Sequence, residues 1–387
     1  MLQTDVDLLI LGGGCAGLSL ALRLAEVPGR CRRVTVIESR PAYVNDRSWC
    51  FWRLGSHRFE PLVTRSWSRV AVRSASRVVD IDCTLTPYQL LESSAFYEHA
   101  RGVIEGKDTV RLVMGVSVAG PPRAVPGGWC VETSVGTLTA TQVIDTRPQK
   151  MPRHGDATLW QSFVGQELVC GQPVFDASRV DLMDFTDAVP EAVAFTYILP
   201  LASNRALVET TLFDPHPYEP ADLMQRQRQA VQRLCGNAPV HVVRTEAGIL
   251  PMGLVRNETA LGHGHLQAGL TSGAARPATG YAFQRIQRWA DACGEALRCG
   301  RLPHGHRPDA LLTRMMDRLF LEVLRSQPGR GPELFMRLFG RTDMRRIVRF
   351  LGDQGTWMDR AAIAASLPAD LFLRQLLSPV PRRLAGA

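Results

Sequence analysis

The N-terminal stretch constrains the fold of this chain more than any other, because its parts follow one another without spacers. An apolar run over residues 6–11 stops at a glycine, which is typical of a central parallel strand buried on both faces. Gly12, Gly14 and Gly17 then form the pattern G-x-G-x-x-G. In this pattern the first glycine permits a tight turn, the second lets the backbone approach a pyrophosphate, and the third allows close packing of helix on strand.

The elements after this turn fit the same interpretation. The sequence predicts a helix over residues 16–26, whose N-terminal N–H groups and dipole would face the phosphates. A second strand follows over residues 34–37, and Glu38 at its end lies 21 residues beyond Gly17. An acid at this place can accept hydrogen bonds from ribose hydroxyls and disfavours a 2′-phosphate. We therefore predict a dinucleotide site, the alternative being a glycine-rich turn in some other βαβ unit.

No second G-x-G-x-x-G follows that could hold a separate NAD(P). One tightly held dinucleotide at the N-terminus favours FAD over NAD as the bound cofactor.

Composition limits the remaining possibilities. At 387 residues, with 45% hydrophobic and 21% charged residues, the chain is long enough for a large core and is globular. Its net charge of +8 comes almost wholly from arginine, since only Lys107 and Lys150 are lysines. The basic residues follow no nucleic-acid reading motif, so we expect no nucleic-acid partner and favour the membrane surface instead.

Cysteine usage and hydropathy indicate the compartment. The nine cysteines are scattered without a C-x-x-C pair, so we expect reduced thiols in a cytosolic protein, with no bound metal and no disulfide framework. No apolar run reaches the 18 residues that a spanning helix needs. The expected localisation is therefore cytoplasmic, with peripheral association at the inner face of the membrane.

An aromatic segment follows the dinucleotide motif. Trp49, Phe51 and Trp52 come after a polar loop, and either they pack into the core or they face a ligand, where aromatic faces would stabilise a cationic intermediate. Further along, residues 69–83 read as strands and residues 88–100 as a helix. Residues 110–118 and 129–135 look like the two arms of a hairpin.

Asp145 ends an apolar strand at the spacing expected for the strand that returns to the sheet beside the cofactor; the alternative role is that of a turn residue at a strand end. Strand-like runs then dominate residues 149–250, with a helix from Pro220 to about Leu234. They suggest an inserted antiparallel sheet that roofs a substrate cavity.

A second glycine-rich loop precedes the helix expected over residues 282–297. It contains Gly269, Thr279, Gly280 and Tyr281, and it would offer a second helix N-terminus to a bound anion or to the edge of a flavin ring. From Leu311 the chain reads as helices, either a core stripe with a solvated face or a basic amphipathic surface for anionic lipid. The expected domains are 1–148 for FAD, 149–250 for substrate, 251–300 returning to the FAD domain, and a helical region over 301–387.

Three longer strings carry a resemblance to a known family. They are Phe195–Phe213 with its Tyr-x-Leu-Pro-Leu and Leu-Val-Glu-Thr-Thr, Glu246–Met252, and Arg276–Tyr281 with its Pro-x-Thr-Gly-Tyr. Together with the glycine turn, they make the chain resemble the flavin-dependent lycopene β-cyclases over nearly its whole length.

The resemblance implies an α/β chain with an α+β insert, a Rossmann-like FAD-binding fold of the aromatic-hydroxylase type. It also implies that reduced FAD is the active form, that NAD(P)H serves only as reductant, and that lycopene is isomerised to γ- and β-carotene.

Glu209 matches the acidic position that the family needs for activity. The chemistry agrees, because ring closure begins by protonating an isolated alkene and ends by removing a ring proton, and a carboxyl kept neutral in an apolar cavity suits both steps. Without the resemblance, Glu209 would be a solvated strand residue.

Two positions depart from the family. Thr210 stands where members often carry a second acid, and Arg276 stands where many carry a histidine. The alternatives are a cyclase of another isoprenoid, an O₂- and NADPH-dependent flavin monooxygenase on the same fold, and a carotenoid carrier without activity.

Overall fold

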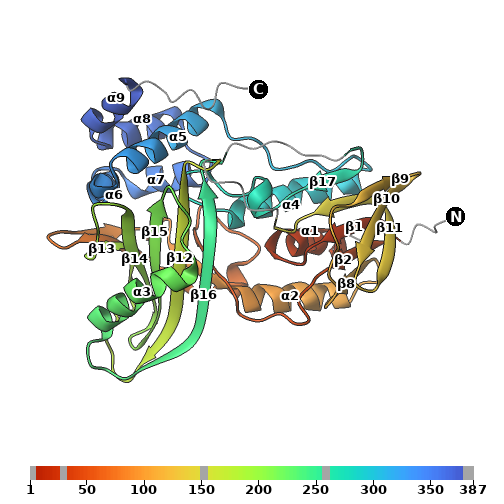
Figure 1. Cartoon of the computed structure of the whole chain (residues 1–387), viewed down its shortest axis with the longest axis horizontal. Coiled ribbons are helices and arrows are strands. Elements are labelled where there is room, and N and C mark those ends of the chain that lie inside the picture. The colour runs from red at the N-terminus through yellow and green to blue at the C-terminus, as the bar shows by residue number, and fades with distance from the viewer. Residues whose placement is uncertain (1–5, 27–32, 149–155, 255–261, 378–387) are drawn as a thin grey trace.

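A mixed sheet built on the first strand forms one side of the molecule in this computed structural model (Figure 1). The structure describes residues 6–26, 33–148, 156–254 and 262–377. The central strand β1 pairs in parallel with β2 and β11, and β8 extends the sheet beyond β2. In spatial order the strands are β8 (Val110–Val113), β2 (Val34–Ile37), β1 (Val6–Leu11), β11 (Gly136–Asp145), β10 (Gly128–Thr133) and β9 (Arg123–Val125), while β17 (His265–Gln267) pairs with β11.

Apolar side chains on both faces of β1 explain its central place. Leu8 and Ile10 pack under the helices of one face, whereas Leu9 and Leu11 pack with Trp129 on the other. These four residues of β1 are fully buried, so the prediction of a strand covered on both sides is confirmed. The covering helices are α1 (Cys15–Ala25), α2 (Ser93–Glu105) and α4 (Phe283–Arg298).

The hairpin expected from residues 110–118 and 129–135 is wrong. β8 lies parallel to β2 at the edge of the sheet, and β10 forms its hairpins with β9 and β11 instead. A single bridge, Val118 to Thr133, joins the two expected arms. The reason is burial, because Val110 becomes part of the core beneath α2 in the parallel position.

The helix expected over residues 88–100 begins later. Residues Tyr88–Glu92 form strand β7, and α2 starts at Ser93. The first four residues of β7 are buried on both sides between β3 and β4. Pairing with two neighbours and burial on two faces outweigh the local helical pattern.

A second seven-stranded sheet forms the other side of the molecule, and α3 lies across it (Figure 1). Its last two strands, β5 and the edge strand β6, come from residues before 148, so it takes strands from both sides of the expected boundary there. The strands and the helix expected within residues 149–250 are confirmed. In spatial order the strands are β16 (Val240–Met252), β12 (Leu159–Cys170), β15 (Arg205–Asp214), β14 (Val193–Ala202), β13 (Arg179–Phe185), β5 (Arg69–Ser74) and β6 (Val78–Asp82), and α3 is Pro220–Cys235.

A small three-stranded sheet links the cores of the two large ones. It has the order β3 (Ser48–Trp52), β7 (Tyr88–Glu92) and β4 (Arg65–Trp67). Because side chains alternate along a strand, Phe51 enters the core of the first sheet and Trp52 that of the second.

The C-terminal region is helical, as expected, and covers one end of the second sheet (Figure 1). The ring of Phe335 in α6 stacks on Phe185 of β13, with centroids 5.8 Å apart. Within the described ranges, none of the helices is both long and apolar enough to cross a bilayer. The helices are α5 (Leu311–Ser326), α6 (Gly331–Arg341), α7 (Met344–Leu351), α8 (Trp357–Ser366) and α9 (Ala369–Leu377), and 3₁₀ turns cover Glu60–Leu62, Leu270–Ser272 and Pro328–Arg330.

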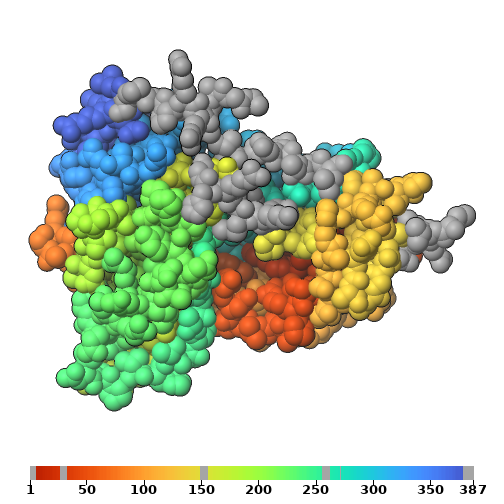
Figure 2. Space-filling view, viewed as in Figure 1, coloured from red at the N-terminus to blue at the C-terminus, as the bar shows by residue number. Residues whose placement is uncertain are grey.

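The outline reflects this arrangement. Figure 2 shows the second sheet in green and the C-terminal helices in blue on one side, and the N-terminal sheet in red to yellow on the other. The two masses meet around the small three-stranded sheet, whose side chains enter both cores.

Candidate active site

The glycine turn has the close contacts that its sequence predicts. Gly12 has φ of +96°, where a side chain would be strained. A Cβ added to Gly17 would lie 1.9 Å from the carbonyl oxygen of Gly12, so only glycine fits there. Thr146, just after β11, donates from Oγ1 to the carbonyls of Leu11 and Gly12, at 2.9 Å each. The turn is therefore held rigidly between the two parallel strands.

The start of α1 is free to receive an anion. A Cβ at Gly14 would meet nothing within 4 Å, and this N-cap glycine provides no side-chain hydrogen bond to the helix. The first N–H groups of α1 therefore lack a capping side chain, which fits a phosphate group better than a closed structural turn.

Glu38 lies beside this turn. Its Oε2 accepts from the backbone N–H of Gly13 at 2.8 Å, and its Oε1 accepts from Nε of Arg40 at 3.0 Å. Although burial favours the neutral acid, the hydrogen bonds from Arg40 and Gly13 hold the pKa of Glu38 below its ordinary value. The group is thus a fixed carboxylate at the end of β2.

The second glycine-rich loop meets the first turn. A Cβ at Gly269 would lie 3.3 Å from the carbonyl oxygen of Thr146 and 3.7 Å from Cβ of Ala16 in α1. The N–H of Gly269 donates to Nε2 of His306 at 3.1 Å. The structure therefore brings the glycine turn and Gly269 together, although more than 250 residues separate them in the chain.

Asp145 lies opposite Leu11 at the end of β11, as expected for the returning strand. Its carboxylate is buried and forms a two-oxygen ion pair with Arg147, with the closest contact at 2.7 Å. Its role toward a cofactor stays a prediction, because Arg147 already occupies both oxygens.

Thr279, Gly280 and Tyr281 lie apart from the phosphate end, against the second sheet. A Cβ at Gly280 would lie 3.2 Å from Oε1 of Gln161 in β12 and 3.3 Å from Cδ1 of Leu250 in β16. This loop therefore spans the junction between the two sheets, as a flavin ring extending from the glycine turn would require.

The side chain of Arg276 anchors this loop to α5 and α7. It is 1% exposed and forms a two-pronged ion pair with Asp317 of α5, at 2.9 and 3.1 Å. Its guanidinium also donates to the carbonyl of Phe350 and lies 4.1 Å from the centre of that ring. This residue therefore ties the loop to the C-terminal helices.

Glu209 lies at the centre of a row of side chains on one face of the second sheet. Across β16, β12, β15 and β14, the row is Glu246, Gly165, Glu209 and Tyr197. A Cβ at Gly165 would lie 3.1 Å from Cβ and 3.3 Å from Oε2 of Glu209. The Glu209 side chain therefore occupies the space that the missing Cβ leaves.

The surroundings of Glu209 favour its neutral form. Burial, and secondarily the negative charge of Glu246, raise the pKa of Glu209 to about 8, against a hydrogen bond from Thr211 at 3.1 Å. Burial also raises the pKa values of Tyr197 and Cys50, whose charged forms Glu209 further disfavours. At neutral pH, the carboxyl group of Glu209 is therefore mostly protonated.

Thr210 points to the opposite face. Its hydroxyl and its N–H both donate to Oε1 of Gln227 in α3, at 2.8 and 3.1 Å. Because adjacent strand residues face opposite sides, an acid at this position would not lie beside Glu209.

Glu246 is a functional candidate that our sequence analysis missed. It is buried, accepts from Arg244 at 2.7 Å and from Ser48 at 3.0 Å, and lies level with Glu209 across Gly165. Two features of the sequence could have indicated it. Glu246 begins the Glu246–Met252 string, and Gly165 is a glycine within a strand, which often marks a close approach of neighbouring groups.

The three aromatic residues of β3 divide between the two cores. Trp49 and Phe51 stack on Phe283 of α4, with ring centres 5.4 and 5.0 Å apart. Trp52 faces the other way and packs on Tyr88, 4.6 Å between centres. Contact of these rings with substrate stays a prediction, and Trp52 is the one on the face toward Tyr197 and Tyr281.

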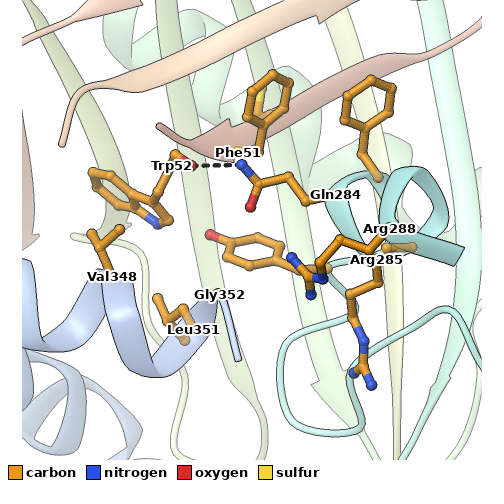
Figure 3. A pocket seen from close by; sticks show the side chains of 12 residues that line it. Phe51, Trp52, Gln284, Arg285, Arg288, Val348, Leu351 and Gly352 are labelled. Atoms are coloured by element: carbon orange, nitrogen blue, oxygen red, sulfur yellow. Dashed lines mark hydrogen bonds between the residues drawn. The ribbon is translucent and has the colours of Figure 1, made fainter. Parts of the chain in front are cut away.

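A small cavity marks the junction of β3, α4 and α7 (Figure 3). Trp52, Tyr281 and Leu351 are among its lining residues, and Gln284 donates to the carbonyl of Trp52 at 2.8 Å. Its volume of about 30 Å³ matches roughly one water molecule. In the described part of the chain, no group of three His, Cys, Asp or Glu side chains is placed to hold a metal ion.

With this geometry in hand, comparisons with known proteins identify the family. The family model described as lycopene cyclase protein matches residues 7–376, nearly the whole chain. This protein belongs to the lycopene cyclase family. A lycopene beta-cyclase of Pseudescherichia vulneris is 25% identical over 306 residues, covering 77% of this chain and 75% of the relative.

Solved structures similar to this family member share its fold. p-Nitrophenol 4-monooxygenase PnpA of Pseudomonas putida DLL-E4 has a TM-score of 0.61 at 15% identity, covering 96% of this chain and 99% of the other. The flavin-dependent monooxygenase PieE, solved with FAD and substrate, gives 0.62 at 14% identity, covering 94% and 72%. The expected Rossmann-like fold of the aromatic-hydroxylase type is therefore confirmed.

Proposed function

We propose that this family member is a flavin-dependent cyclase of lycopene or a closely related apolar polyene, converting ψ-end groups to β-ionone rings. The observation that carries the proposal is Glu209, a buried carboxyl largely neutral at pH 7, whose neighbour Tyr197 on β14 is within electrostatic reach of both Glu209 and Tyr281 of the glycine-rich loop. Family membership supports the substrate class.

The proposed cofactor is FAD. Its pyrophosphate would lie at Gly14 and the start of α1, its ribose at Glu38, and its ring along the loop from Gly269 to Tyr281. The uncapped helix start and the open space at Gly14 fit such a group. When bound in the reduced form, FAD supplies an electron-rich ring that stabilises positive charge, and NAD(P)H would serve only to reduce it.

The chain's own residues would then move one proton in each direction. Glu209 gives its proton to the terminal alkene, which leaves a tertiary cation that the neighbouring double bond attacks to close the ring. The resulting carboxylate takes a ring proton back, so the substrate is isomerised without net oxidation. A pKa near 8 places the acid close to the operating pH, where one group can serve as both donor and acceptor.

The proposed localisation is the cytoplasmic face of the membrane. Large apolar side chains are exposed on the first turns of α5 and α8, where Nη2 of Arg360 lies 3.5 Å from Oγ1 of Thr313. Arg314 and Arg318 flank them and would favour anionic lipid. The exposed apolar residues of α5, α8 and α9 are Leu311, Leu312, Met315, Trp357, Met358, Leu373, Leu376 and Leu377.

The deciding experiment gives the purified chain lycopene in liposomes with reduced FAD and no oxygen. We expect γ- and β-carotene on the chromatogram, with no NAD(P)H consumed in proportion to product once the flavin is reduced. A requirement for O₂, or consumption of one NADPH per turnover, would instead indicate a monooxygenase on the same fold. Unchanged lycopene with retained FAD would favour a carrier.

A further inference from the structure

A buried charged network borders the proposed site without belonging to the dinucleotide region. Arg244 in β16 donates to Glu246 and to Glu167, at 2.7 Å each, and to the hydroxyl of Ser48 at 2.7 Å. Both carboxylates are at most 5% exposed. Arg205, the first residue of β15, forms a second ion pair with Glu167. Such a network has a high desolvation cost, so its position calls for an explanation.

The position of the network relative to Glu209 supplies that explanation. Along β12, Gly165 is opposite both Glu209 and Glu246, whereas Glu167 and its partner Arg244 lie two residues further along the strands. Among the members of the network, Glu246 is thus the one level with Glu209. Strand β12 lies between the strands of Glu209 and Glu246, and its residue at this level is Gly165. Because glycine has no side chain, residue 165 does not shield one carboxyl group from the other.

We propose that Glu246, fixed as a carboxylate by Arg244 and Ser48, is a positioning residue that keeps Glu209 protonated until substrate arrives. The inference rests on the proposed function of Glu209. Two nearby carboxyls in a medium of low dielectric cannot both ionise easily, and the one that holds the guanidinium keeps the charge. The pair would then consist of one carboxylate paired with a guanidinium and one proton donor.

The other groups around Glu209 do not supply a competing charge at neutral pH. They are Tyr197 on β14, Cys50 on β3, Tyr88 on β7 and Tyr281 on the glycine-rich loop, and burial raises the pKa of each. From its own strand, the hydroxyl of Thr211 is neutral. Within the row, Glu246 is therefore the charged side chain whose removal should change the pKa of Glu209.

The test is the pH profile of cyclisation by the FAD-loaded enzyme and by its Glu246→Gln variant, each at saturating reduced FAD. In the wild type, turnover should fall as pH rises through about 8, where Glu209 loses its proton. In Glu246→Gln, we expect turnover to fall at a pH about one unit lower, because the negative charge that disfavoured ionisation of Glu209 is gone. Glu246→Asp should restore most of the profile.

Glu167→Gln is the matched control, since it removes a buried carboxylate from the same arginine but away from the level of Glu209. The cyclisation rate of this control variant should fall at the same pH as that of the wild type. If Glu246→Gln fails to fold because Arg244 is left with less compensation, Arg244→Gln/Glu246→Gln removes the pair together. Because the carboxylate is level with Glu209 and the guanidinium lies two residues further along, this double variant should show a downward shift that is smaller than the shift in the single variant. The inference is overturned if the cyclisation rates of Glu246→Gln and of the double variant both fall at the same pH as the wild-type rate.

A second readout does not depend on turnover. Relative to the unsubstituted protein, Glu209→Gln should raise the free energy of unfolding by an amount that grows between about pH 4.5 and pH 8 and is constant above that. In the Glu246→Gln background this growth should stop at a lower pH and reach a smaller final value. If the wild type makes no cyclised product, the proposed function fails while this measurement still decides the coupling. Loss of cyclisation by Glu246→Gln at every pH would mean that Glu246 acts on the substrate itself, which also overturns the positioning role.

Discussion

At the scale of single residues, the proposed chemistry depends on Glu209 being partly accessible and yet surrounded by poorly solvating groups. Gly165 makes room for the side chain on one side, and Tyr197 borders it on the other. Its pKa near 8 has a cost for the fold, because a carboxyl that resists ionisation destabilises the native state at alkaline pH. Activity and stability therefore oppose each other at this residue.

Glu209→Gln should abolish ring closure while FAD stays bound. Glutamine keeps the shape of the side chain but cannot donate a proton to an alkene, so we expect turnover to fall by about 10²–10⁴-fold or more. The measurement is carotene formed per bound flavin. A variant that loses flavin as well would mean that Glu209 supports the cofactor site instead of the chemistry.

The same substitution should stabilise the protein at high pH. The pKa of Glu209 rises from 4.5 in the unfolded chain to about 8 in the folded one, so the stability that the neutral acid provides is complete below 4.5 and is lost as pH rises through 8. Glutamine stays neutral, so the variant should gain roughly 5 kcal/mol over the wild type at pH 9 and almost nothing at pH 4. Urea unfolding at several pH values tests this, and a pH-independent difference would contradict it.

At the scale of elements, two glycine-rich loops hold the proposed cofactor site, and their contacts differ in kind. Gly17 is required by backbone contact with Gly12, whereas Gly14 faces open space. The second loop depends on Arg276, whose ion pair with Asp317 ties it to α5. Arg276 is thus a structural connection between elements.

Gly17→Ala and Gly14→Ala form a matched pair. A Cβ at residue 17 would collide with a backbone oxygen, so we expect a loss of about 2–4 kcal/mol in unfolding free energy. A Cβ at residue 14 meets no protein atom, so stability should change by less than about 0.5 kcal/mol while FAD affinity falls. Flavin titration and urea unfolding separate the two effects. Unchanged FAD affinity in Gly14→Ala would contradict the assigned phosphate site.

Arg276→Met should destabilise the fold by about 3–5 kcal/mol, because it leaves Asp317 buried without its partner. The double variant Arg276→Met/Asp317→Leu should recover a large part of this loss, since no uncompensated charge remains. Urea unfolding of the three proteins measures the difference. A double variant no more stable than the single one would mean that contacts of Arg276 other than the ion pair dominate.

At the scale of the whole molecule, the apolar residues exposed on α5, α8 and α9 lie on the helical region that packs over the end of the second sheet (Figure 1). A polyene dissolved in lipid would reach the protein from such a surface. The glycine turn lies in the other mass of the molecule, so lipid contact and cofactor binding would not compete for the same surface (Figure 2).

Leu312→Asp and Trp357→Asp should each weaken binding to vesicles containing anionic lipid, because they place charge in the apolar contact. Val135→Asp is the control: this residue is 71% exposed, comparable to the 73% of Trp357, but lies on the turn between β10 and β11. Co-flotation with vesicles should fall for the first two and not for the third. Equal loss in all three would mean that the proposed surface is not the contact.

The sequence by itself determined the dinucleotide fold and the identity of the acid. Both are local patterns: the glycine spacing dictates a turn that only glycine can make, and the strings around Glu209 and Tyr281 identify the family. What local patterns could not supply was the pairing of distant segments. The edge position of β8 and the strand over residues 88–92 depended on burial against neighbours that are remote in the chain.

Only the tertiary structure decided what surrounds the acid. Thr210 follows Glu209 directly, yet it faces α3, while Glu246 is 37 residues away in the chain and faces the same side as Glu209 across Gly165. A strand sends adjacent side chains to opposite faces, and sheet pairing sets which distant residues are level with each other. The electrostatic environment of Glu209 is therefore a product of register, which sequence spacing alone does not specify.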